Sequence, residues 1–396
     1  MRIAHGARRA RKRPKACGNG LSRMLQWRAN RASHVIHGSA TLRIVELDIL
    51  RFLSTLSVLL HHYLAWYSLD FPRGSVVIDG LFRVFQYAFV CLPLFFLISG
   101  FVIFMSASGR SARSFAIGRI VRLYPTYWLC MTITAGYALL SGVGEIATVS
   151  PATYLVNLSM LQSFLGFEDV DIVYWTLAVE LQFYLCILVL LWTGVLQRVR
   201  VWLAIWTALT ISYMVFSQPF FLPAVIDPWY SPFFIAGISF AMIRREGTSV
   251  FYRVMLLVSL VLASIDTYDS TADFIANPTV FDRGASVFVI GLFYAAFYLV
   301  ATKRVRMKPS PMWALLGGIT YPLYLIHNKA GKILMHAMEP GLGPKGAIAI
   351  TTVLALALSY GIFLLIEKNV TPPFRAGLVA LLSVFRKQKK AGANPG

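Results

Sequence analysis

The run LDILRFLSTLSVLLHHYLAWY, residues 47–67, indicates the fold of the whole chain. Its length matches the roughly 20 apolar residues that a helix needs to cross a bilayer. Similar segments follow at 84–106, 123–141, 175–196, 201–217, 229–243, 252–266, 284–301, 312–335 and 346–366. Backbone polar groups cannot stay unpaired in lipid, so each segment is expected to be helical. The sequence predicts an all-α polytopic membrane bundle of about ten transmembrane helices.

The overall composition agrees with this interpretation. The 396 residues are 57% hydrophobic and 14% charged, whereas soluble domains carry about 25% charged residues. No stretch between the apolar segments is long enough for a separate soluble domain. We expect three parts: a basic cytoplasmic tail at 1–40, which we interpret as disordered, a transmembrane domain at 41–370, and a second basic tail at 371–396. The short apolar piece at 152–166 is expected to be re-entrant or interfacial.

The loop charges predict the orientation. Lys and Arg concentrate in cytoplasmic loops, and here basic and acidic loops alternate along the chain. With ten helices, both ends would lie in the cytoplasm. The net charge of +20 therefore indicates membrane topology, and we do not expect a nucleic-acid partner. The basic loops contain Arg110, Arg113, Arg198, Arg200, Arg244, Arg245, Lys303, Arg304, Arg306 and Lys308; the others contain Glu145, Glu168, Asp169, Asp171, Asp266, Asp269, Asp273 and Asp282.

Polar residues inside the first segment form a stripe. Arg51 and His62 are eleven residues apart, which places them about 20° apart around a helix and about 16 Å apart along it. Asp48 and Thr55 share that face, whereas His61 points elsewhere. Ionisable groups in a membrane are costly and commonly functional. The alternative is that Arg51 anchors the helix at the cytoplasmic side and His62 lies at an interface.

Two further candidates lie in and after the second segment. Ser99 and Gly100 are small residues within the bulky run FFLISGF, where they favour either close helix packing or a gap for a ligand. Arg119 and Arg122 lie three residues apart before Pro125. Two guanidinium groups so placed can clamp a phosphate, or they can anchor the topology.

The fourth apolar segment carries a carboxylate, Glu180, with Thr176 and Tyr184 at four-residue spacing on its face. A lone carboxylate in lipid needs a partner. The predicted topology puts Glu180 at the depth of His62, so we expect the pair to interact, with the carboxylate orienting the imidazole ring. A purely structural buried pair is the alternative.

The ninth segment has a polar face formed by Thr320, Tyr324, His327 and Asn328, and Pro322 is expected to loosen the helix there. This face either contributes to a site or bonds to neighbouring helices. We expect no metal centre, because the seven histidines are dispersed and no HExxH or CxxC motif occurs.

Together these segments resemble the acyltransferase 3 family of integral membrane acyltransferases. The resemblance covers residues 44–368 and rests on five motifs in order. They are Arg51-x10-His62, FFLISGF (95–101), RIVRLYP (119–125), WTLAVELQFY (175–184) and YPLYLIH (321–327). The chain ends before the esterase-like domain that some relatives carry, so it resembles the single-domain branch.

The resemblance implies transfer of an acyl group, usually acetyl, from acyl-CoA to a hydroxyl of a carbohydrate or lipid-linked glycan, in the cell inner (plasma) membrane. It maps catalytic roles to His62, Glu180 and Arg51. Arg119, Arg122, Ser99 and Gly100 would contact the acyl-CoA co-substrate, and Tyr184, Tyr324 and His327 would contact the substrate.

Two mechanisms stay open at this stage. His62 acts either as a general base on the acceptor hydroxyl, oriented by Glu180, or as a nucleophile that forms a transient acyl-histidine. A transporter or flippase that uses the buried Arg, His and Glu as a substrate or proton pathway is the alternative from another class. A membrane O-acyltransferase of another family is the third.

Overall fold

The computed structural model describes residues 44–66, 76–142, 149–275 and 278–391. Every regular element within these ranges is a helix, as expected for an all-α protein. The tail predicted at 1–40 lies outside the described residues. Most of the tail predicted at 371–396 forms a helix, Thr371–Ala391.

Helices lie along all the predicted apolar segments, but the ninth, 312–335, is divided between two helices at His327 and Asn328. The short piece expected at 152–166 contains a short α-helix, Pro151–Asn157, and a 3-10 turn, Gln162–Phe164. The helices are α2 (Val45–His61), α3 (Val76–Phe85), α4 (Cys91–Ala107), α5 (Ala112–Ser141), α6 (Pro151–Asn157), α7 (Trp175–Trp192), α8 (Val199–Phe216), α9 (Leu222–Val225), α10 (Ser231–Glu246), α11 (Val250–Phe274), α12 (Val280–Ala301), α13 (Pro311–Ile326), α14 (Lys329–Leu365) and α15 (Thr371–Ala391).

Six helical stretches in the described part of the chain are long and apolar enough to cross a membrane. They are Gly80–Ala107, Ile172–Trp192, Val199–Phe216, Val250–Phe274, Val280–Ala301 and Lys329–Ser383. The last stretch contains a break, because Gly343 has a φ of 65° and interrupts α14. The chain is therefore a helical protein with several membrane-spanning candidates, while the total of about ten crossings and their orientation stay predictions.

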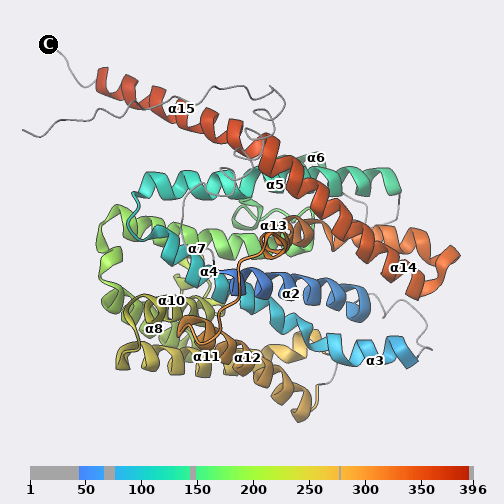
Figure 1. The fold of residues 1–396 in the computed structure, drawn as a ribbon, viewed down its shortest axis with the longest axis horizontal. Coiled ribbons are helices and arrows are strands. Elements are labelled where there is room, and N and C mark those ends of the chain that lie inside the picture. The colour runs from blue at the N-terminus through green and yellow to red at the C-terminus, as the bar shows by residue number, and fades with distance from the viewer. Residues whose placement is uncertain (1–43, 67–75, 143–148, 276–277, 392–396) are drawn as a thin grey trace, which may run out of the picture. The chain divides into compact units, whose positions relative to one another are not determined.

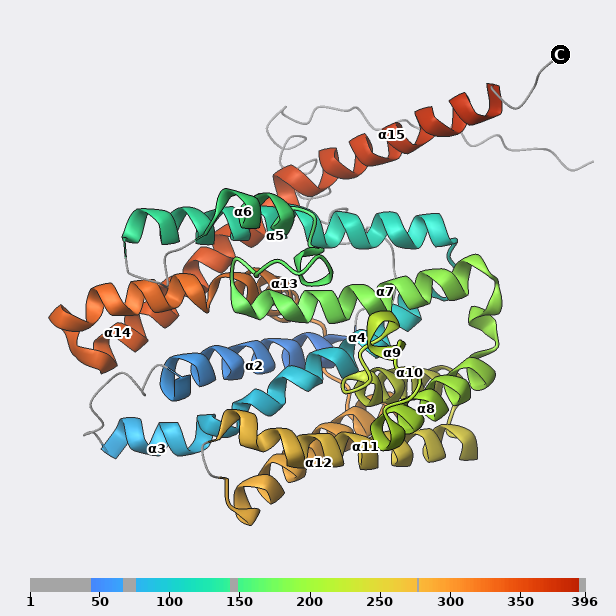
Figure 2. The ribbon, with the colours of Figure 1, turned by 180° about the vertical axis from the view of Figure 1, so that it is seen from behind.

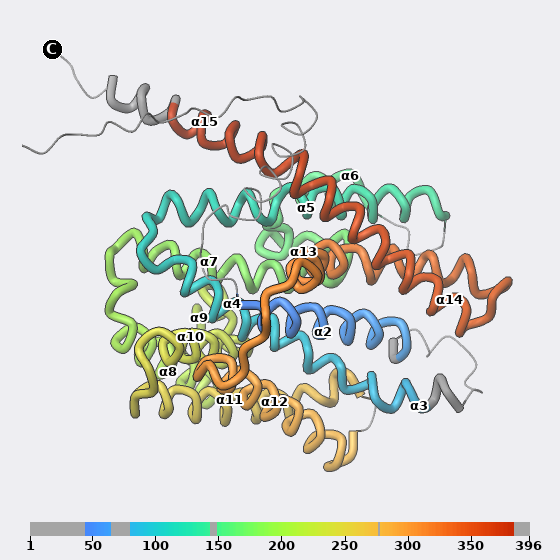
Figure 3. Tube along the Cα trace, in the orientation of Figure 1, coloured from blue at the N-terminus to red at the C-terminus, as the bar shows by residue number. Residues whose placement is uncertain are grey.

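The long helices α2, α4, α5 and α7 run along the long axis of the view (Figure 1), and α6 lies over α5 when the molecule is seen from behind (Figure 2). Figure 3 shows the C-terminal helix α15 following α14, and Phe374 of α15 packs edge-on against Trp128 of α5. The helix α5 begins eleven residues earlier than the predicted segment. Its basic first turns are polar, so a search for apolar residues misses them, and Ser111 caps them by accepting from the backbone N–H of Ser114.

The closest helix crossing joins α4 to α10. A Cβ atom added to Gly100 would lie 2.5 Å from the carbonyl oxygen of Phe234, and one added to Gly237 would meet the carbonyl oxygen of Leu97. Small residues allow backbones to approach in this way. All residues of α10 from Ser231 to Ile243 are buried. The space beside Gly100 is thus filled by α10, which favours the close-packing alternative for this residue.

Two interruptions of helical geometry position the polar residues. After His61 the chain changes to a π-helical turn, His62–Trp66, a feature that often occurs at functional sites. The second interruption separates α13 from α14 at His327 and Asn328. The two breaks face each other, because Gly331 of α14 packs directly on the hydroxyl of Tyr63.

Candidate active site

Glu180 lies at the centre of a first polar cluster between α4 and α7. Its Oε1 atom accepts hydrogen bonds from Ser99 Oγ at 2.8 Å and from Tyr184 Oη at 2.6 Å. Tyr184 reaches the carboxylate because residues four apart lie on the same helical face. Ser99 and Tyr184 are buried. The carboxylate is therefore fixed from two helices.

Arginine side chains surround this carboxylate. Arg51 of α2 interacts electrostatically with Glu180 and with Arg122, and Arg119 also interacts with Glu180. The guanidinium of Arg119 lies 5.6 Å from the ring centre of Phe115 and 5.8 Å from that of Tyr184. Arg51 also interacts with the carboxylate of Asp48, so Glu180 and Asp48 together face three arginines.

Arg119 carries unused donors. Its Nε and Nη1 atoms are buried and have no hydrogen-bond partner among the described residues, whereas the side chain of Arg122, one turn later, is exposed. A buried donor without a partner is costly. Such a guanidinium is suited to an anionic ligand that supplies the missing acceptors.

A second polar cluster is centred on two histidines from distant parts of the sequence. Nδ1 of His62 lies 2.8 Å from Nε2 of His327, and the ring planes differ by 7°. Nδ1 of His327 lies 2.7 Å from the carbonyl oxygen of Tyr324. His327 is completely buried. The two rings form a chain of hydrogen bonds that ends on the backbone of α13.

Asp171 holds the break between α13 and α14. It is buried and accepts from Asn328 Nδ2 at 2.6 Å and from the backbone N–H of Lys329 at 2.7 Å. Tyr63 Oη donates to the carbonyl oxygen of His327 at 2.8 Å. Sequence reasoning treated Asp171 as a loop charge and did not single out Tyr63. The available signal was the position of Asp171 directly before a helical run, where it accepts from Val173 N–H.

His61 and His62 point in different directions, as the helix geometry predicts. Nδ1 of His61 lies 2.9 Å from the carbonyl oxygen of Phe85, and its ring packs against Phe89 and Phe274. His62 instead faces His327. Both rings lie inside the protein, so the two histidines differ in the direction of their side chains and in their partners, and not in whether they are inside.

The structure does not reproduce the expected pairing of His62 with Glu180. Instead, His62 bonds to His327, and Glu180 bonds to Ser99 and Tyr184. The depths explain this. Helices α7 and α13 are antiparallel and meet where Thr176 Oγ1 lies 3.0 Å from Tyr324 Oη. Glu180 lies one turn from that level in one direction and His327 nearly one turn in the other, so they are separated by about 10 Å along the axis.

The remaining candidates also have defined places. The hydroxyl of Tyr324 lies against Thr176 and donates to the carbonyl oxygen of Val173 at 3.1 Å. Thr55 Oγ1 donates to the carbonyl oxygen of Arg51. The side chain of Asp48 packs on Gly317 of α13. Two residues of the polar stripe, Asp48 and His62, therefore contact α13 or the residue that follows it.

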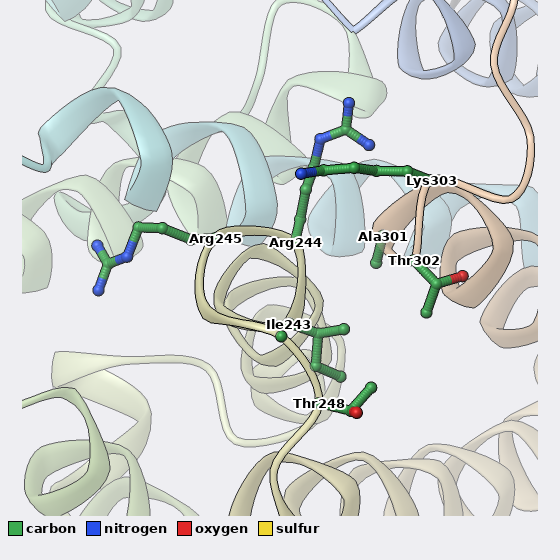
Figure 4. A pocket seen from close by; sticks show the side chains of 8 residues that line it. Ile243, Arg244, Arg245, Thr248, Ala301, Thr302 and Lys303 are labelled. Atoms are coloured by element: carbon green, nitrogen blue, oxygen red, sulfur yellow. The ribbon is translucent and has the colours of Figure 1, made fainter.

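A pocket of about 340 Å³ lies elsewhere, at the ends of α10 and α12 (Figure 4). It contains none of the predicted site residues, although its lining is basic. Arg244 is already engaged, because its Nη1 donates to the carbonyl oxygen of Val300 at 2.6 Å. The lining residues are Ile243, Arg244, Arg245, Gly247, Thr248, Ala301, Thr302 and Lys303.

No group of three or more His, Cys, Asp or Glu side chains suited to a metal ion occurs among the described residues. The two polar clusters consist of arginine, carboxylate, hydroxyl and imidazole groups. Cations beside one end of α2 and an imidazole near the other suit a reaction between an anionic donor and a neutral acceptor.

Two comparisons with known proteins find similar sequences. A family model described as an acyltransferase domain matches residues 44–367. The chain is also similar to nodulation protein 10 of Rhizobium leguminosarum bv. viciae, with 29% identity over 163 residues, which cover 36% of this chain and 43% of that protein. The match thus spans less than half of the relative's length. No solved structure matches the chain significantly.

Proposed function

This chain belongs to the acyltransferase 3 family, and on that premise we propose that it is a membrane O-acyltransferase. It moves an acyl group, with acetyl as the first to test, from cytoplasmic acyl-CoA to a hydroxyl of a cell-surface glycan or a similar acceptor. The setting is the inner membrane, which the protein crosses several times. A transporter or flippase is disfavoured, because the family model covers nearly the whole helical domain.

The observation that carries this proposal is the unsatisfied guanidinium of Arg119. Its buried Nε and Nη1 atoms have no acceptor among the described residues, and CoA carries phosphates that offer several. Arg122 and Arg51 add positive charge on the same side. Arginine binds phosphate in a bidentate manner, so these residues fit the anionic part of the donor.

The acyl end of the donor reaches His62 along α2. By their spacing Arg51 and His62 lie on one face of α2, about 16 Å apart along the axis. The pantetheine arm is extended and largely uncharged, and its length suits the distance between a phosphate site and a reacting imidazole. Ser99 and Glu180 hold the arginines at the donor end, and Gly100 maintains the packing of α4.

His62 serves as the general base in the reaction. It removes the proton from the acceptor hydroxyl, and the oxygen attacks the thioester carbonyl carbon. The carbon–sulfur bond then breaks, and the CoA sulfur leaves and takes the proton back from His62. The products are an ester and free CoA, and the imidazole returns to its starting state. General base catalysis of this kind contributes about 10²–10⁴-fold.

The acceptor binds on the side of His62 and His327. We propose that Tyr184 and Tyr324 act mainly by fixing Glu180 and α7, since their hydroxyls are engaged there. A hydroxyl group of a carbohydrate is the simplest acceptor for a base placed near the outer end of the bundle. It needs no charge neutralisation, unlike the donor.

The experiment that tests this function is acetyl-CoA turnover by the purified full-length protein in detergent. Wild type is compared with His62→Ala and with His61→Asn, which retains a donor for the carbonyl of Phe85. We expect slow CoA release by wild type and His61→Asn, and loss in His62→Ala. If wild type neither binds acetyl-CoA nor releases CoA, the proposal fails and a transport role becomes the better explanation.

A further inference from the structure

We propose that His327 is a positioning residue for His62: it holds His62 in the tautomer with the proton on Nδ1, so that Nε2 is the reacting nitrogen. The catalytic consequence rests on the proposed function. The tautomer itself follows from the contacts around the two rings and can be measured whether or not the protein transfers acyl groups.

The first step is the relative position of the rings. They are nearly parallel, with centroids 4.9 Å apart and nitrogens 2.8 Å apart. Rings stacked face to face would keep their atoms roughly 3.5 Å apart. The centroid separation instead exceeds the nitrogen distance by about the two ring radii, as it does when coplanar rings meet edge to edge. The contact is therefore a hydrogen bond between the rings of His62 and His327.

The second step fixes the direction of that hydrogen bond. The carbonyl oxygen of Tyr324 can only accept, so Nδ1 of His327, 2.7 Å away, carries a proton. Neutral imidazole has one N–H, which leaves Nε2 of His327 with a lone pair. A second proton would place a charge on a side chain that is completely buried, at a high cost. His327 therefore accepts from Nδ1–H of His62.

The third step is the rigidity of His327. Its carbonyl oxygen accepts from Tyr63 Oη, and its backbone N–H donates to Leu323 O at 3.1 Å. The next two residues are held by Asp171. A ring flip would place a carbon against the carbonyl of Tyr324 and break that bond. The backbone on both sides thus prevents His327 from offering a different atom to His62.

The consequence for catalysis is a defined proton position. With Nδ1–H donated to His327, the lone pair of His62 is on Nε2, which receives the proton from the acceptor hydroxyl. The resulting imidazolium keeps its hydrogen bond to Nε2 of His327. A carboxylate usually orients a catalytic histidine. Here a neutral imidazole has that role, and Glu180 instead interacts with the arginine side chains Arg51 and Arg119.

The direct test is nitrogen NMR of the full-length protein labelled with ¹⁵N-histidine, with the His62 signals identified by their loss in His62→Gln. Spectra are recorded at a pH of about 8, above the ordinary imidazole pKa. We expect a protonated Nδ1 and an unprotonated Nε2 on His62. A protonated Nε2 with an unprotonated Nδ1 overturns the inference, regardless of the enzymatic activity.

A kinetic test uses two variants of His327. His327→Gln keeps an oxygen that accepts from His62, and His327→Leu removes the acceptor. We expect His327→Leu to lower kcat by about 100-fold, with KM for acetyl-CoA changed less than about threefold and the Nδ1–H signal of His62 reduced. His327→Gln should remain within about tenfold of wild type.

The outcomes separate the two proposals. Wild-type kcat in a folded His327→Leu protein overturns the positioning role. A loss in His327→Gln as large as in His327→Leu, in folded proteins, also overturns it. If wild type shows no acetyl-CoA turnover, the proposed function fails, while the NMR spectrum of wild type still decides the tautomer.

Discussion

The hydroxyl of Ser99 donates a hydrogen bond of 2.8 Å to Oε1 of Glu180, and this bond joins α4 to α7 through one carboxylate. The same oxygen accepts from Tyr184. Glu180 also interacts electrostatically with Arg51 and Arg119. The carboxylate is thus the common partner of groups from four helices, and its removal should affect all of them.

Replacing Glu180 with Gln keeps the hydrogen-bonding shape and removes the charge. Glu180 is half-buried, and hydrogen bonds to charged groups contribute about 1.5–3 kcal/mol, so thermal unfolding in detergent should occur at a lower temperature. Ser99→Ala removes one hydrogen bond and should cost about 1 kcal/mol. Equal unfolding temperatures for the two variants would show that the charge of Glu180 does not hold the cluster together.

Arg119→Ala should weaken donor binding. Hydrogen bonds to charged groups contribute about 1.5–3 kcal/mol, so KM for acetyl-CoA should rise by about 10- to 100-fold, with kcat changed much less. Arg113→Ala is the matched control, because Arg113 is an exposed arginine on the same helix. Similar increases in KM for both variants would attribute binding to general positive charge and not to the buried guanidinium.

Gly100→Ala should destabilise the bundle. Its new methyl group would lie 2.5 Å from the carbonyl oxygen of Phe234, and overpacking typically costs 1–3 kcal/mol. Gly136→Ala in α5 is the control, since nothing lies within 4 Å of its added Cβ. There the substitution should be neutral or stabilising by up to about 1 kcal/mol. The unfolding temperatures of the two variants check this, and an unchanged Gly100→Ala protein would contradict the close crossing.

The loop between α6 and α7 should contribute a pH-dependent term to stability. Burial raises the pKa of Asp169 to about 6, although a hydrogen bond from Gln162 at 2.7 Å opposes the shift. A raised pKa in the folded state means that stability is fully present below the unfolded pKa of about 3.9 and is lost as pH rises through about 6.

Asp169→Asn should therefore flatten the dependence of unfolding temperature on pH between about 4 and 7. The change should be small, because Asp169 is only partly buried and solvent screens its charge. Unfolding measured in detergent across this range checks the prediction. A slope that is unchanged in the variant would assign the pH dependence to other groups.

Much of the fold is predictable from sequence, because membrane helices follow from local composition. Helices lie along all the predicted apolar segments, with a break inside the ninth, and Asp48 of α2 and His62 directly after it contact Gly317 and His327. Boundaries were less predictable. The first turns of α5 are basic, and the break at Gly343 separates two apolar runs within α14. In both cases the helical geometry depends on capping or backbone torsion more than on hydropathy.

The candidate residues were also identified from sequence, but not their partners. Ionisable groups within apolar segments are conspicuous, so His62, Glu180 and Arg119 could be named. The expected His62–Glu180 bond depended on assigning both to the same depth, and the antiparallel packing of α7 and α13 places them about two turns apart. Asp171 was missed because a carboxylate in a loop is ordinarily solvated, and only its bonds to Asn328 and Lys329 reveal its role.

The sequence by itself determined that this protein is helical, that it belongs in a membrane, and that the motifs of an acyltransferase family run through it. These properties depend on local hydropathy and spacing. Only the tertiary structure decided that His62 meets His327 across 265 residues, and that α10 fills the space beside Gly100. Such contacts depend on how far each helix slides along its neighbour, which packing of whole helices sets and no local pattern encodes.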